Sequence, residues 1–93
     1  MKTLTEYSRK ILKLICDELE ITEEDVISGK STLATDARSI YIALLSDKLS
    51  VKEISLVTGM SSQVVSKLKN EFVVRVQRWS VSICYSNIKT QLR

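Results

Sequence analysis

Proline is absent from this chain of 93 residues, and glycine occurs only at positions 29 and 59. Because these two residue types interrupt helices most strongly, their scarcity predicts a mostly helical chain with short connections. Histidine is also absent, and Cys16 and Cys84 lie far apart in the sequence without a paired metal-ligand spacing. We therefore expect no metal site and two reduced, partly buried thiols, although the spacing leaves a disulfide between them open.

Long apolar runs are missing as well. The longest uncharged stretch, residues 54–66, has thirteen residues, whereas a membrane-spanning helix needs roughly 18 or more. The amino-terminal segment carries Glu6, Arg9 and Lys10 before the apolar core of an export signal could form. The sequence therefore predicts a cytoplasmic protein without membrane contact.

The residues that most enzymes use are scarce in this chain. It has no histidine, no glycine-rich phosphate loop and no metal-spaced cluster. The acidic run DELEITEED at residues 17–25 lacks the ordered spacing of a calcium-binding loop. We expect no enzymatic activity, no cofactor and no small-molecule substrate.

Charge is unevenly distributed, although the formal net charge is only +3. Residues 17–25 hold six acids and no base, whereas the chain from Ile54 onward holds six bases against one acid, Glu71. A basic half can meet a polyanion such as nucleic acid while the acidic half is turned away from it. Two solvated faces are the alternative interpretation.

Apolar spacing and capping signals predict an all-α fold, a compact bundle of five to six helices in one domain over residues 1–93. Apolar residues at steps of three and four form one stripe over 3–19. Thr22 opens a short helix that we expect to end near Gly29 as a left-handed cap. Thr35 or Asp36 is the expected cap of the third helix.

The second half of the chain has clearer boundaries. Ser50 and Glu53 form a capping box that opens a helix up to about Thr58, and Ser61 or Ser62 caps the next one. Residues 71–92 are ambiguous, because their apolar residues fit a helical spacing while positions 79–83 also alternate as in a strand. The absence of glycine and proline after position 59 favours one long C-terminal helix over about 71–92.

Residues 50–70 match the requirements of a helix-turn-helix. Gly59 fits the turn, where a positive φ angle is needed, and Ser55 is small where the two helices approach. Thr58 stands where a larger apolar residue is more usual. The expected inner seam consists of Ile54, Met60, Val65 and Leu68.

The outer face of the second helix would be the DNA-reading surface. Its side chains can all form hydrogen bonds: Ser61, Ser62, Gln63, Ser66, Lys67 and Asn70. The amides of Gln63 and Asn70 suit adenine, and Lys67 suits guanine or phosphate, while Lys52 and Lys69 could hold the DNA backbone. An ordinary polar solvent face has the same composition, but no acid lies between Glu53 and Glu71 to repel phosphate.

From about Ile11 to Asn70 the chain resembles the C-terminal DNA-binding domain of the bacterial replication initiator DnaA, which belongs to the Trp-repressor-like group. The resemblance is carried by ICDELEITEEDVISGKS and ARSIYIALLSDKLSVKEISLVTG. It implies a helical fold and a phosphate contact at Arg38. It does not extend to the family's arginine-rich loop, here KSTLATD, or to its recognition segment, here TGMSSQVV. The family's ATPase module is absent too, so replication initiation is not implied.

We therefore expect a small helix-turn-helix protein that binds double-stranded DNA, with transcriptional regulation as its role. A protein-interaction module that keeps the fold without binding DNA is the alternative. The tail has more apolar residues than one helix face needs, and Trp79 is the only tryptophan. That surplus predicts a homodimer through the C-terminal helix, which would also suit DNA; closure of the domain's own core by Trp79 is the other interpretation.

Overall fold

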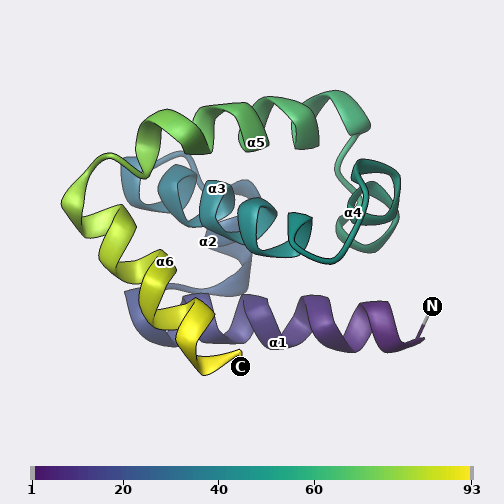
Figure 1. Ribbon diagram of the computed structural model, residues 1–93, viewed down its shortest axis with the longest axis horizontal. Coiled ribbons are helices and arrows are strands. Elements are labelled where there is room, and N and C mark those ends of the chain that lie inside the picture. The colour runs from purple at the N-terminus through teal and green to yellow at the C-terminus, as the bar shows by residue number, and fades with distance from the viewer. Residues whose placement is uncertain (1, 93) are drawn as a thin grey trace.

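A computed structural model describes residues 2–92 of the protein. These residues form six helices (Figure 1). They are α1 (Lys2–Leu19), α2 (Glu23–Ser28), α3 (Thr32–Ser46), α4 (Val51–Thr58), α5 (Ser62–Arg75) and α6 (Trp79–Gln91). The described residues form no strand, so the all-α prediction is confirmed. None of these helices combines the length and the apolar character needed to span a membrane.

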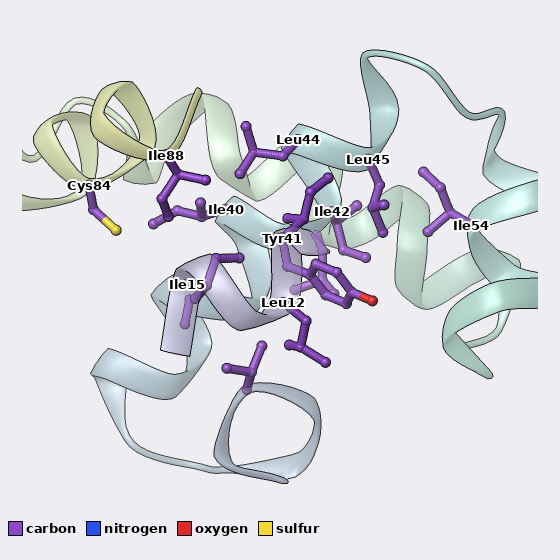
Figure 2. Close-up of a cluster of buried hydrophobic side chains, with 14 of the residues drawn as sticks. Leu12, Ile15, Ile40, Tyr41, Ile42, Leu44, Leu45, Ile54, Cys84 and Ile88 are labelled. Atoms are coloured by element: carbon purple, nitrogen blue, oxygen red, sulfur yellow. The ribbon is translucent and has the colours of Figure 1, made fainter. Parts of the chain in front are cut away.

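Helix α3 is the centre of the domain and packs against each of the other five helices. It is apolar around most of its circumference, as expected for a helix that is covered on all sides. Ile40, Ile42 and Leu45 are completely or almost completely buried. Figure 2 shows these side chains between residues of α1, α4 and α6. The core therefore fixes α5 and α6 against one common support.

Helix α3 begins earlier than the sequence indicated. Ser31, rather than Thr35 or Asp36, caps it, and its Oγ accepts a hydrogen bond from the Ala34 N–H at 3.1 Å. The early start places Asp36 inside the helix, where it is buried. Because Ser31 caps the helix five residues earlier, Asp36 is a buried acid and not the cap that the sequence predicted.

Gly29 ends α2, but it is not the left-handed cap that we expected. Its φ and ψ angles are −64° and 152°, which any residue can adopt. Glycine is needed there because a Cβ atom would lie 2.5 Å from the carbonyl oxygen of Asp25 and 2.8 Å from the Cβ of Ala34. The constraint on this position is close packing and not backbone conformation.

The expected single helix over 71–92 is also wrong. Helix α5 ends at Arg75, and a tight turn at residues 76–78 leads into α6. In that turn the Gln77 and Arg78 N–H groups donate to the carbonyls of Val74 and Arg75, and Arg78 is extended. Folding back lets α6 bury Val81, Cys84 and Ile88 against the core, which a straight helix could not do. Both cysteines are free.

Candidate nucleic-acid interface

The unit formed by α4, the turn at residues 59–61 and α5 begins with a complete capping box. The Ser50 Oγ accepts from the Glu53 N–H at 3.2 Å, and the Glu53 carboxylate accepts from the Ser50 N–H at 3.0 Å. These two bonds satisfy amide groups that the first turn of a helix leaves unpaired. The sequence prediction for the start of this helix is confirmed.

Gly59 ends α4 in the left-handed conformation, with a φ angle of 77°. Its N–H donates to the Ser55 carbonyl at 3.0 Å, while the Ser55 hydroxyl donates to the Met60 carbonyl at 2.6 Å. Thr58 contributes as well, because its hydroxyl donates to the Ile54 carbonyl and accepts from the Met60 N–H. Ser55 and Thr58 therefore hold the turn by hydrogen bonds, a role that their small size and polarity did not indicate from the sequence.

The inner seam of the unit lies where the sequence placed it. Ile54 and Val65 are fully buried, Leu68 is nearly so, and the half-buried Met60 packs against the same core. Because α5 also packs extensively on α3, its orientation is set by the core and not only by the turn. The opposite face of α5 is consequently held in a fixed position toward solvent.

That outer face contains a shallow hollow, which we call the α5 hollow. Five of the predicted contact residues line it together with one acid, the full set being Ser62, Gln63, Ser66, Lys67, Asn70 and Glu71. The five predicted residues are all exposed. Within it, Gln63, Lys67 and Asn70 follow one another at steps of four and three, so they form one stripe along the helix.

The remaining predicted contacts on α4 and α5 do not line the α5 hollow. Ser61 is the N-cap of α5, and its Oγ accepts from the Val64 N–H at 3.2 Å. Lys52 is exposed near the start of α4, and Lys69 is exposed on α5. Lys69 points away from Lys67, since two residues correspond to about 200° around a helix. Neither lysine lines the hollow.

Glu71 changes the charge of the α5 hollow, and the sequence analysis did not place it there. Its carboxylate lies 3.9 Å from the Lys67 ammonium and 3.2 Å from the Arg75 guanidinium. The i,i+4 spacing of Glu71 to both bases is the sequence signal that could have revealed this. The stripe therefore ends on an acid that reduces the positive potential of Lys67.

Arg38, for which the resemblance implied a contact with a DNA phosphate, forms hydrogen bonds within the domain. Its Nε donates to the Val26 carbonyl at 2.8 Å, and its Nη2 donates to the Gly29 carbonyl at 2.6 Å. The side chain thus joins the end of α2 to α3 and does not line the α5 hollow. These two bonds give Arg38 a structural role, and its phosphate contact stays a prediction.

Arg75 and Arg78 are also engaged within the domain, although they belong to the basic half of the sequence. Both guanidinium groups contact the buried carboxylate of Asp36, at 2.7 Å and 3.1 Å. The hydrogen bond to Asp36 raises the pKa of Arg75, so this guanidinium stays charged. The cations left on the outer side of α4 and α5 are Lys52, Lys67 and Lys69.

Comparison with protein-family models, with curated proteins and with solved structures finds no match for this chain. The described residues contain no cluster of acidic or thiol side chains that could hold a metal ion. What the fold and the site define is an all-helical protein with an exposed, polar α5 face.

Proposed function

We propose that this protein binds double-stranded DNA and that α4, the turn and α5 act as a helix-turn-helix with α5 in the major groove. The observation that carries the proposal is the α5 hollow, in which five side chains capable of hydrogen bonding gather on one exposed helix face. A major groove about 12 Å wide admits one helix, and α5 lies along the upper edge of the molecule in Figure 1.

The stripe of Gln63, Lys67 and Asn70 supplies the base contacts in this proposal. Amide side chains can bond adenine through two hydrogen bonds, and a lysine can reach guanine or a phosphate. Gln63 and Asn70 are seven residues apart, which is about 10.5 Å along a helix and close to the length of three base-pair steps. The protein would therefore read a short site with the two amides on separate base pairs.

Phosphate contacts come from the edges of the same surface. Ser61 and Ser62 lie at the amino end of α5, where backbone N–H groups favour an anion. Lys52 on α4 and Lys69 on α5 lie outside the hollow. In this proposal each of them contacts the phosphates of one DNA strand. With three lysines as cations, the slope of log affinity against log salt should be about −3 or shallower.

The resemblance of the sequence to the DnaA C-terminal domain motivates duplex DNA as the ligand, but not the initiator's binding site. The Met60, Ser61 and Ser62 side chains stand where that family has its base-contacting residues. Transcriptional regulation is the role that we propose for such a DNA reader.

A protein-interaction module is the second candidate, and one observation favours it. Three arginines that could have held phosphates, Arg38, Arg75 and Arg78, donate to groups inside the domain, and Lys67 lies close to Glu71. On this hypothesis the α5 face contacts a polar protein surface, and duplex DNA does not bind even at low salt.

The deciding experiment measures binding to a randomised duplex pool at low salt by fluorescence anisotropy, followed by selection of the bound sequences. The variant Lys67→Glu with Gln63→Ala should lose DNA binding while its melting temperature stays unchanged. The matched control is Lys13→Glu with Gln91→Ala, since both control residues are exposed and lie on α1 and α6.

The outcomes separate the two candidates. Loss of binding in the α5 variant alone supports the proposal. Equal binding by wild type and both variants would place the DNA contact on another surface. No binding by the wild-type protein at micromolar concentration would leave the interaction module as the function.

A further inference from the structure

The outer face of α5 changes from polar to apolar toward the end of the helix. Val73 is 65% exposed and Val74 69%, and both lie in the last turn before α5 ends at Arg75. A second shallow hollow, lined by Glu71, Val74 and Arg75, adjoins the α5 hollow because Glu71 lines both. The two valines therefore continue the surface that we propose for DNA.

Helical spacing places the valines in line with the polar residues. Val74 follows Asn70 by four residues and Val73 follows it by three, so all three lie on one side of α5. The stripe of Gln63, Lys67 and Asn70 is thus extended by one further turn. From Gln63 to Val74 the rise is about 16.5 Å, which corresponds to about five base-pair steps of DNA.

The folding of the domain does not explain these two side chains. The inner face of the same helix is formed by Val65 and Leu68, which are buried, and by the half-buried Phe72. Valine is a weaker helix former than alanine or lysine, because its branched Cβ restricts the χ1 angle. Two consecutive valines on an exposed face therefore weaken the helix without adding to the core. Apolar groups that lie together in such a position indicate a contact surface.

The side chains of this face favour A·T pairs over G·C pairs in a major groove. Amides such as those of Gln63 and Asn70 bond adenine, whereas apolar side chains contact the methyl group of thymine. Guanine is most often bound by arginine. Lys67 is the only cationic residue among those that line the α5 hollow, and its ammonium lies 3.9 Å from the Glu71 carboxylate. The chemistry of the face is therefore that of an A·T reader.

We propose that Val73 and Val74 contact thymine methyl groups and that the protein selects A·T-rich duplex DNA. This inference rests on the proposed function and names the class of DNA that the same surface binds. Val73 lies about 4.5 Å and Val74 about 6 Å beyond Asn70 along the helix, which is between one and two base-pair steps. The contacted thymines are therefore one or two pairs beyond the adenine that Asn70 bonds.

Three duplexes of equal length test this inference by fluorescence anisotropy at low salt. The first contains A·T pairs in mixed order, and the second has uracil in place of every thymine, which removes only the methyl groups. The third has inosine in place of adenine and cytosine in place of thymine. Its minor groove resembles that of A·T DNA, while its major groove resembles that of G·C DNA.

The wild-type protein should distinguish all three duplexes. It should bind the A·T duplex about tenfold or more tightly than the inosine duplex, because the amides lose their adenines. It should bind the A·T duplex about fourfold more tightly than the uracil duplex for each methyl group that a valine covers.

The variant Val73→Ser with Val74→Ser should bind the uracil duplex as tightly as the A·T duplex, because no apolar group is left to cover a methyl. It should still prefer the A·T duplex to the inosine duplex, since Gln63 and Asn70 remain. Ile83→Ser is the matched control, because Ile83 is also β-branched and exposed but lies on α6. This control should respond to uracil as the wild type does. Circular dichroism confirms that each variant keeps its fold.

A second copy of the chain is the other occupant that could cover the valines. Sedimentation velocity of the protein without DNA tests this alternative. A dimer that dissociates in the double valine variant, and persists in the Ile83→Ser control, would overturn the inference.

The binding outcomes separate this inference from the proposed function. A uracil effect that the valine variant abolishes, together with discrimination against the inosine duplex, supports the inference. Wild-type binding that ignores uracil, a uracil effect that persists in the valine variant, or equal binding of the A·T and inosine duplexes would overturn it while DNA binding itself stands. No binding to any of the three duplexes would overturn the proposed function and this inference together.

Discussion

The guanidinium of Arg75 lies 2.7 Å from the carboxylate of Asp36, a residue 39 positions earlier in the chain. Asp36 is on α3 and only 5% exposed, and Arg78 contacts its second oxygen at 3.1 Å. One buried acid thus holds both the last residue of α5 and the turn that follows. This cluster fixes the end of α5 and the start of α6 to the central helix.

Loss of Arg75 should destabilise the protein through the acid that it leaves behind. A buried carboxylate that loses its partner usually costs 3–5 kcal/mol, but Arg78 remains, so we expect Arg75→Ala to cost about 2 kcal/mol. Urea unfolding measures this change. Asp36→Asn combined with Arg75→Met should recover part of the loss, and Lys89→Ala, at the exposed Asp47–Lys89 pair, should change little. A stable Arg75→Ala protein would contradict the structural role of the cluster.

The two glycines should respond differently to substitution. Gly59→Ala should cost about 1 kcal/mol, because an L-residue is strained at a φ angle of 77°, and Gly59→Asn should cost less because asparagine tolerates this conformation. At Gly29 asparagine offers no such relief, since any Cβ meets the Asp25 carbonyl. Thermal unfolding of Gly59→Ala, Gly59→Asn, Gly29→Ala and Gly29→Asn checks this. Equal effects of alanine and asparagine at position 59 would contradict it.

Stability should fall in alkaline solution because of Cys84. Burial raises the pKa of its thiol to about 11 from an ordinary value of 9.0. Below pH 9 both folded and unfolded chains keep the proton, so stability is unaffected. Between pH 9 and 11 the unfolded chain ionises first, and about 2 to 3 kcal/mol of stability is lost, after which this loss levels off.

The variant Cys84→Ala isolates that effect. The comparison between wild type and variant uses the change of the free energy of unfolding with pH, and not its absolute value. Unfolding by urea at intervals between pH 8 and 11 should give a shallower decline in the variant. A decline persists above pH 10, since burial also raises the pKa of Tyr41. Identical slopes in both proteins would show that Cys84 ionises freely in the folded state.

Glu71→Gln should tighten DNA binding if the proposed function is right. The substitution removes a negative charge from the α5 hollow and releases Lys67 from its neighbour at 3.9 Å. A several-fold gain in affinity for duplex DNA, with a steeper salt dependence, is expected. Glu53→Gln on α4 is the control, because its capping bond needs only an oxygen. Unchanged affinity would place phosphates far from Glu71.

The sequence predicted the parts of the fold that depend on local chemistry. The Ser50–Glu53 box, the Gly59 turn and the seam of Ile54, Val65 and Leu68 are each determined by spacing within one or two helical turns. The cap of α3 was misplaced because Ser31, Thr35 and Asp36 all suit a cap, and only the tertiary burial of Asp36 distinguishes them.

The internal contacts of the arginines were hidden for the same reason. Arg38, Arg75 and Arg78 each contact a group 9 to 42 residues away in the chain, which a local pattern does not reveal. The break between α5 and α6 was missed as well, because it contains no glycine or proline, the residues that signal a break in a local pattern. The α5 hollow itself was predictable, since all but one of its residues follow from removing the inward positions of one helix.

The internal use of the arginines has a consequence for how such a protein would search a genome. Non-specific attachment to DNA depends on cations that face the phosphates, and the described outer side of α4 and α5 offers three lysines for that purpose. Residence on random sequence would be brief, with short sliding and frequent return to solution. Discrimination would then rest on the amides and hydroxyls of α5, and occupancy of a site would depend on how many copies of the protein the cell contains.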